Sequence, residues 1–177
     1  HQAAAVLDGG WAKWIREQRP VRSGEESRPP AVFTAHRRKE LRVMVDHVQA
    51  SLGDSSLLLV DARAPERFAG ANEPLDRTPG HIPGAVNHFY KRNMTEDGVM
   101  LPPERLRQQF AEVLADHRPD QVVMYCGSGV TACHNLLAME HAGLPGAKLY
   151  VGSWSEWSAD PARPVETSSN LKVQNEK

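Results

Sequence analysis

The chain contains two cysteines, and one of them, Cys126, stands where an apolar, β-branched segment gives way to a glycine-rich loop. Residues 122–135 read VVMYCGSGVTACHN, so the loop begins with Gly127, Ser128 and Gly129 and then passes into a helical pattern. Glycines allow a tight curl that turns backbone N–H groups inward, and the helix start adds further donors and partial positive charge. These donors favour the nucleophilic thiolate. We therefore predict that Cys126 is a reactive nucleophile; the alternative is an inert buried cysteine.

The residues after the loop receive structural interpretations. Cys133 lies two helical turns beyond Cys126 in an Ala- and Leu-rich setting, which predicts a small core residue. A resolving cysteine is the alternative, although two helical turns make a direct disulfide awkward. We expect Val130 to lie in the core, and Thr131 to cap the helix or to donate to the loop.

Strand-like and helix-like segments alternate around this loop. Short apolar runs predict strands at residues 57–63, 121–126 and 147–152, and helical spacing predicts helices at residues 102–117 and 130–143. Strands separated by helices indicate βαβ units and a mainly parallel sheet, which is the α/β class. The carboxyl ends of strands are where such sheets carry their chemistry, and Cys126 falls at such an end.

The composition limits the partners and the setting. A chain of 177 residues with a formal net charge of −1 offers no strongly basic surface for nucleic acid. No stretch approaches the apolar length of a membrane span. Two cysteines make no disulfide framework, so a reducing, cytoplasmic compartment is expected. The eight histidines show no metal-ligand spacing with cysteine, so we expect no metal and no cofactor.

Two segments of the chain resemble each other. Residues 6–21 and 149–165 share a Gly-x-Trp-x-x-Trp pattern followed by Arg-Pro-Val, about one domain length apart. The matching residues are Gly9, Trp11 and Trp14 in the first copy, and Gly152, Trp154 and Trp157 in the second. We interpret the first copy as the end of a preceding, related domain; a chance likeness is the alternative.

This similarity gives a domain plan. Residues 1–21 are predicted to be the tail of a preceding domain that this sequence otherwise lacks. Residues 22–30, rich in Ser, Gly and Pro, are predicted to form a linker. Residues 31–165 would then form the catalytic domain, followed by a polar tail at residues 166–177.

Five separated motifs resemble those of one family. CGSGVTACH (126–134) occurs together with VDAR (60–63), RF (67–68), GHIPGAVN (80–87) and GSWSEW (152–157). In this order and spacing they resemble the catalytic domain of two-domain rhodanese-type sulfurtransferases, over roughly residues 31–165. The resemblance implies a mainly parallel sheet with helices on both faces.

The resemblance also implies an activity. In this family the loop cysteine, here Cys126, takes one sulfur from a donor as a persulfide. The persulfide then passes its sulfur to cyanide or to a thiol, and the thiol acceptor can be thioredoxin-like.

Donor choice is interpreted from the same resemblance. The neutral Gly-Ser-Gly pattern resembles enzymes that prefer 3-mercaptopyruvate, whereas enzymes that prefer thiosulfate carry basic residues after the cysteine. Arg67 matches an arginine that holds the donor carboxylate. The second such arginine aligns near Leu75 or Asp76, with Arg77 shifted. Arg63 is a substrate-binding candidate or, equally, a structural ion-pair partner.

Other polar and aromatic motif residues receive structural roles. Ser128 is expected to polarise the substrate carbonyl or to assist proton transfer. Asp61 and His81 form a possible acid–base pair, but we favour loop orientation for Asp61 and turn packing for His81. The two C-terminal tryptophans, Trp154 and Trp157, are expected to pack the last helix, and a pocket wall is the alternative.

The loop cysteine raises two rival functions. A phosphatase or arsenate reductase needs Cys-x5-Arg, and the required arginine position holds Ala132, which excludes this class. A non-catalytic sulfur-carrier or interaction module is the second rival. Because donor pockets of the two-domain enzymes lie near the domain interface, we expect this chain to form a persulfide but to turn over poorly by itself.

Overall fold

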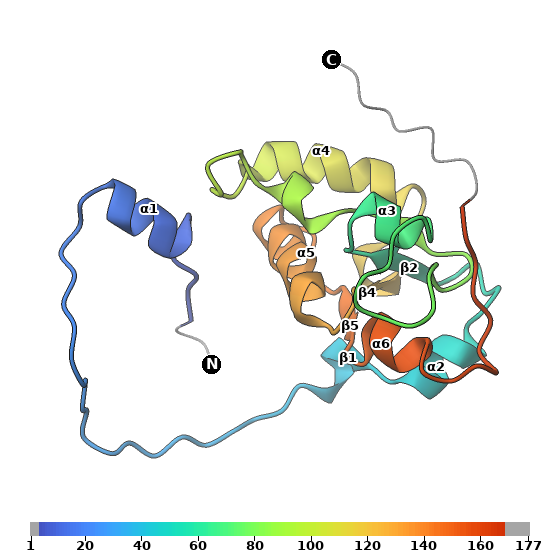
Figure 1. Ribbon diagram of the computed structural model, residues 1–177, viewed down its shortest axis with the longest axis horizontal. Helices are drawn as coiled ribbons and strands as arrows, with labels where there is room; N and C mark the ends of the chain where they lie inside the picture. The colour runs from blue at the N-terminus through green and yellow to red at the C-terminus, as the bar shows by residue number, and fades with distance from the viewer. Residues whose placement is uncertain (1–3, 169–177) are drawn as a thin grey trace.

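A parallel five-stranded sheet forms the centre of the molecule (Figure 1). The structure is a computed structural model that describes residues 4–168. The strand order is β1-β5-β4-β2-β3, and every neighbouring pair runs parallel. The predicted α/β class with a mainly parallel sheet is confirmed. The strands are β1 (Arg42–Val43), β2 (Leu58–Asp61), β3 (Val86–Asn87), β4 (Val122–Tyr125) and β5 (Lys148–Tyr150).

Helices cover both faces of the sheet, as the family resemblance implied (Figure 1). Successive strand residues point to opposite faces, so each strand feeds two separate cores. Val60 and Met124 pack with residues of α4 (Pro103–Leu114) and α5 (Val130–His141). Leu59 and Val123 pack on the other side with residues of α2 (Val45–Ala50) and α6 (Ser153–Trp157). All four residues of β2 and of β4 are buried, which explains their continuously apolar sequences.

The predicted central elements are confirmed, with shorter strands than expected. Helix α5 ends as predicted near Gly143, whose φ of +73° suits glycine. The edge strands β1 and β3 were missed because each has only two residues and leaves no period-2 pattern. Also unpredicted were α3 (Pro65–Phe68) and the 3-10 turns η1 (Lys39–Leu41), η2 (Tyr90–Asn93) and η3 (Pro119–Gln121). Within residues 4–168, none of the helices is long and apolar enough to cross a membrane.

A short helix precedes the folded body. This helix, α1 (Gly10–Arg16), is followed by an exposed stretch, residues 19–38, without helix or strand (Figure 1). The predicted linker lies inside that stretch, and the first element of the body is η1, later than the expected start at residue 31. The segment around α1 touches the body where Asp8 Oδ1 accepts the Met100 N–H at 2.8 Å.

The body extends past the predicted start of the polar tail. Glu166 pairs with His81 through two backbone hydrogen bonds, of 2.8 and 3.0 Å, in an antiparallel bridge. The Ser168 N–H donates to the Ala69 carbonyl at 3.2 Å. The predicted tail of residues 166–177 therefore begins with three residues that pack on the body, and its remainder lies outside the described residues.

Candidate active site

Cys126 lies at the carboxyl end of β4 and is only 2% exposed. It belongs to the same core as Met124 and Ala132, on the face of the sheet that α5 covers. A buried anion is costly unless hydrogen-bond donors surround it. The chemistry of Cys126 therefore depends on the donors that its loop supplies.

The loop supplies a run of free backbone donors. Gly129, with φ +80°, is the N-cap of the 12-residue helix α5. Within the described part of the chain, the N–H groups of residues 127–131 donate no hydrogen bond, whereas the Cys126 N–H is already bonded to Ser153 Oγ. Successive free amides at a helix N-terminus form a concave site for an anion. The loop therefore contains the free amides on which the predicted anion site depends.

The two loop glycines face different neighbours. A Cβ on Gly129 would lie 2.6 Å from the Val151 carbonyl oxygen, so only glycine fits there. A Cβ on Gly127 would lie 3.6 Å from both Nη atoms of Arg67, at an ordinary contact distance. Gly129 therefore sets the shape of the loop, and Gly127 marks the place where an arginine side chain meets it.

Arg67 thus lies beside the loop, but its guanidinium is already paired. Its Nη2 lies 2.7 Å from Glu73 Oε1 and 3.2 Å from Asp76 Oδ2. Burial raises the pKa of Glu73, but hydrogen bonds from Arg67 and from the backbone of Leu75 and Asp76 outweigh burial, and the pKa is lowered overall. A donor carboxylate that binds Arg67 must share it with these two carboxylates.

Arg63 is buried in an ion-pair network. Its guanidinium contacts Asp61 Oδ2 at 2.7 Å and Glu73 Oε2 at 3.0 Å, and it stacks over Trp154 at 4.7 Å. Burial lowers the pKa of Arg63, but the hydrogen bond and the charge of Asp61 outweigh it and raise the pKa overall. With a side chain 1% exposed, Arg63 fits the structural alternative better than substrate binding. Asp61 also accepts the Arg63 N–H at 2.9 Å, in keeping with the expected role in orienting the loop.

The other candidate residues are more exposed. Arg77 is exposed and, among the described residues, makes no ion pair. Its neighbour Asp76, not Arg77, reaches Arg67. Ser128 is also exposed, in the middle of the Gly-Ser-Gly segment. Its hydroxyl makes no hydrogen bond to another described residue.

Two expectations for the start of α5 are wrong, and one of the two alternatives for Thr131 is excluded. Val130 is 72% exposed and not part of the core. Cys133 is also exposed, and its thiol donates to the Gly129 carbonyl at 3.3 Å. Although the residue is exposed, partial burial of its thiol and the nearby charge of Cys126 raise the pKa of Cys133. No side chain caps α5, so Thr131 does not serve as its cap.

His81 and the tryptophans have packing roles, as expected. His81 is buried, stacks on Phe68 at 3.7 Å between ring centroids, and contacts the Phe68 carbonyl at 2.7 Å through Nδ1. Trp154 and Trp157, both on α6, are fully buried in the core that α6 covers. The alternative roles, an acid–base pair and a pocket wall, find no support in this arrangement.

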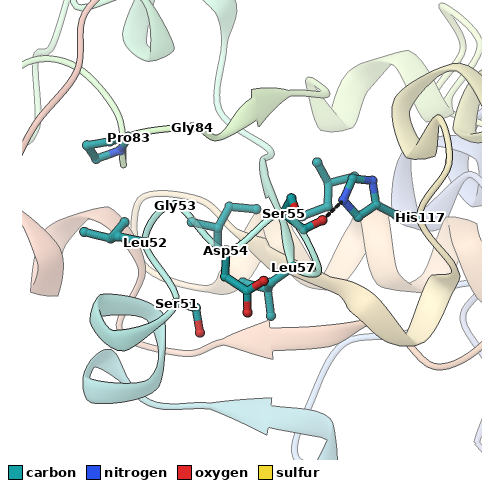
Figure 2. Close-up of a pocket in the computed structure, with 11 residues that line it drawn as sticks. Ser51, Leu52, Gly53, Asp54, Ser55, Leu57, Pro83, Gly84 and His117 are labelled. Atoms are coloured by element: carbon teal, nitrogen blue, oxygen red, sulfur yellow. Dashed lines mark hydrogen bonds between the residues drawn. The ribbon is translucent and has the colours of Figure 1, made fainter.

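A hollow of about 260 Å³ lies elsewhere on the surface (Figure 2). Its lining includes residues that directly precede β2 and β3, together with His117, whose Nε2 contacts the Ser55 carbonyl at 2.9 Å. These segments lie at the amino ends of the strands, whereas Cys126 follows the carboxyl end of β4. The hollow is therefore separate from the candidate active site.

Sequence reasoning missed three residues of the site. Glu73 and Asp76 hold Arg67, and Ser153 bonds the backbone of Cys126. The acidic residues lie in an irregular loop that has no periodicity to identify them. Ser153 lies inside the GSWSEW motif (152–157), but nothing in the sequence indicates a role for its hydroxyl.

Comparisons with known proteins agree with this architecture. Residues 44–160 match the rhodanese-like domain family. A probable 3-mercaptopyruvate sulfurtransferase of Pseudomonas aeruginosa is 48% identical, over 92% of this chain and 57% of its own. The human 3-mercaptopyruvate sulfurtransferase is 38% identical over 96% of this chain and 57% of its own. The rat thiosulfate sulfurtransferase is 40% identical over 89% of this chain and 54% of its own.

The chain therefore belongs to the rhodanese-like domain family. It spans about half the length of the curated relatives that it matches. Among solved structures, the anaerobic ergothioneine biosynthesis enzyme of Chlorobium limicola superposes with a TM-score of 0.79. That similarity covers 93% of this chain and 41% of the other at 22% identity, and it supports the fold alone.

Proposed function

We propose that this chain is a sulfurtransferase domain that carries sulfur as a persulfide on Cys126. The observation that carries the proposal is the buried Cys126 followed by five consecutive backbone N–H groups that are unpaired within the described residues. A thiolate and a terminal persulfide are both anions, so the same donors stabilise the resting and the loaded forms. The names of the relatives support the same reaction class.

The proposed reaction has two half-reactions. The Cys126 thiolate attacks the transferable sulfur of the donor and forms an S–S bond. With thiosulfate the donor S–S bond breaks and sulfite leaves, whereas with 3-mercaptopyruvate a C–S bond breaks and the enolate of pyruvate leaves and takes up a proton. Cyanide or a thiol, including that of a thioredoxin-like protein, then removes the outer sulfur and restores the thiolate. This is covalent catalysis of the ping-pong type.

We infer that 3-mercaptopyruvate is the preferred donor. Its carboxylate suits a single arginine beside the loop, and Arg67 lies against Gly127. Residues 127–129 place no cation in the loop, whereas a compact dianion such as thiosulfate would favour cationic side chains there. The preference is tested by comparing kcat/KM for both donors, with thiocyanate formed from cyanide as the readout. A higher kcat/KM for thiosulfate would contradict it.

The variant Cys126→Ser tests the enzyme proposal itself. We expect it to lose thiocyanate production with both donors, while Cys133→Ser keeps it. The matched variant is informative because Cys133 is the other cysteine and is the exposed one. Turnover that persists in Cys126→Ser would refute the proposed site.

A sulfur-carrier module with little turnover is the second candidate function. It is favoured by the structure around α1, where Trp11 is 66% exposed, whereas the matching Trp154 is fully buried. A carrier would load one sulfur per chain and release it slowly. An enzyme would produce many thiocyanate ions per chain, so the number of turnovers separates the two.

We further propose that α1 closes a preceding domain of the same kind. The two similar segments share their side-chain geometry: Trp14 Nε1 donates to the Pro20 carbonyl at 3.0 Å. In the second copy, Trp157 Nε1 donates to the Pro164 carbonyl at 2.9 Å. An arginine lies over each tryptophan ring, at 5.5 Å in the first copy and 5.8 Å in the second. This agreement supports a true repeat over a chance likeness.

A further inference from the structure

Ser153 adopts a backbone conformation that serine rarely takes. It is fully buried, and its φ is +54°, in the left-handed region. For a residue with a Cβ this conformation costs roughly 1–2 kcal/mol, a cost that glycine avoids. Such strain at a buried position often accompanies a functional site. The contacts of the Ser153 side chain indicate what the serine supplies in return.

The Ser153 hydroxyl joins the ends of two strands at the nucleophile. Its Oγ accepts the N–H of Cys126 at 3.1 Å and donates to the Tyr150 carbonyl at 2.9 Å. The regular pairing of β4 with β5 extends as far as Met124 and Leu149. The hydroxyl therefore continues the connection between the two strands beyond the ladder and fixes the backbone at Cys126.

The two residues after Ser153 fix the next two peptides. The N–H of Trp154 donates to the Cys126 carbonyl, and the N–H of Ser155 donates to the Gly127 carbonyl, both at 2.9 Å. In a planar trans peptide the C=O and the following N–H point in opposite directions. Because these carbonyls point at α6, the N–H groups of the following residues point away from it. They thus remain available to an anion, at the start of the run of unpaired donors.

The repeat within the chain provides an internal comparison. Gly10 occupies the position in the first copy that Ser153 occupies in the second, and its φ is +55°. A Cβ on Gly10 would meet nothing within 4 Å, so the space does not demand glycine; the φ angle does. The turn before the first tryptophan therefore has the same left-handed conformation in both copies, with glycine in the first and serine in the second. A serine is present where its hydroxyl meets Cys126.

We propose that Ser153 is a positioning residue for the persulfide loop. Its hydroxyl holds the Cys126 backbone so that the N–H groups of residues 127–131 surround the sulfur. The inference rests on the proposed role of Cys126 as the sulfur carrier. It adds the residue that orients the donors on which that role depends.

The test compares Ser153→Gly and Ser153→Ala with the wild-type chain. Ser153→Gly keeps the φ angle without strain but removes the Cβ together with the hydroxyl, whereas Ser153→Ala removes the hydroxyl alone, so the pair separates positioning from folding. We expect both variants to remain folded by circular dichroism. The rate at which iodoacetamide alkylates Cys126 at a fixed, neutral pH should fall by about tenfold, because the thiolate is the nucleophile. The kcat for thiocyanate formation should fall by about tenfold or more, with a smaller change in KM.

Ser158→Gly is the matched control. Ser158 lies at the C-terminal end of α6, and its hydroxyl makes no hydrogen bond within the described residues. We expect its alkylation rate and its kcat to equal those of the wild type.

Two results would overturn the proposal. The first is an unchanged alkylation rate and kcat in folded Ser153→Gly. The second is loss of folding in both Ser153 variants, which would make Ser153 a residue of the fold and not of the loop. Failure of the proposed function is distinct: the wild type would then not load sulfur, while the alkylation rates would still differ between the wild type and the Ser153 variants.

Discussion

Two single residues of the loop, Gly127 and Gly129, are expected to differ in their tolerance of the same substitution. Gly129→Ala forces a Cβ to within 2.6 Å of the Val151 oxygen at φ +80°, so we expect it to destabilise the fold by more than the roughly 1–2 kcal/mol of the left-handed conformation alone. Gly127→Ala meets only ordinary contacts and should stay close to wild-type stability. Thermal unfolding of both variants checks this. Equal stability of the two would contradict the loop geometry.

Asp76 is a residue that we expect to limit donor binding. It lies 3.2 Å from Arg67 and accepts the Ser155 hydroxyl at 2.7 Å, so it occupies part of the guanidinium that a donor carboxylate would use. Asp76→Asn should lower KM for 3-mercaptopyruvate by about fivefold, equivalent to ~1 kcal/mol, with little change in kcat.

A surface change separates this effect from overall charge. Asp116→Asn also removes one negative charge, from an exposed position that precedes η3 and β4. We expect its KM to match the wild type. A rise in KM for Asp76→Asn would show instead that Asp76 holds Arg67 in place for the donor.

At the scale of elements, a buried polar network joins η2 to α5. Asn93 connects to His88 at 2.8 Å and to Asn135 at 2.7 Å, and Asn135 donates to the His88 carbonyl at 2.9 Å. The amide oxygen of Asn93 accepts from His88 Nε2, so in the neutral ring the proton is on Nε2 and Nδ1 carries none. That Nδ1 is buried without a partner among the described residues. Burial accordingly lowers the pKa of His88.

This network predicts a loss of stability in mild acid. Because the folded-state pKa of His88 is lowered, the unfolded chain binds more protons below about pH 6.5, and stability falls as the pH decreases through that value. His88→Gln keeps a donor for Asn93 but does not titrate, so its free energy of unfolding should decrease less between pH 7.5 and 5.5. Urea unfolding at the two pH values measures this. The same decrease in wild type and variant would rule out His88 as a cause.

The β4–loop–α5 unit shows what could and could not be predicted from the sequence. The β4–loop–α5 unit was predictable because a buried strand, glycines and helical spacing follow one another. The buried face of α5 was not, because the polar Asn135 lies in the core beside Ala132, Ala138 and Met139. The helix face that is buried therefore includes Asn135, and Val130 and Cys133 lie outside that face.

Irregular loops were the other place where the sequence was insufficient. The Arg67 match located one side chain beside Gly127, but ion pairs between loop residues leave no periodic pattern. Their partners, Glu73 and Asp76, follow only from the folded path of the chain.

On the scale of the whole molecule, α1 and the stretch after it contribute little to the body. Their polar contacts with it include the Asp8–Met100 hydrogen bond and an exposed ion pair between Arg16 and Asp97 at 3.7 Å. Surface ion pairs contribute about 0–1 kcal/mol. Deletion of residues 1–38 should therefore lower Tm by no more than about 4 °C and leave sulfur loading intact.

The deletion also tests the interpretation of the repeat. Around α1 it removes exposed apolar side chains, Val6, Leu7, Trp11 and Ile15, which we assign to a preceding domain. We expect self-association in gel filtration, where present, to decrease. A large loss of stability would show that α1 belongs to this body and not to another domain.

The mass of the intact protein after incubation with 3-mercaptopyruvate, without an acceptor, tests the central claim most directly. The account predicts a gain of one sulfur atom, located by peptide mapping to the buried Cys126 and removed by cyanide. No added sulfur with either 3-mercaptopyruvate or thiosulfate, or sulfur found on the exposed Cys133 instead, would contradict it.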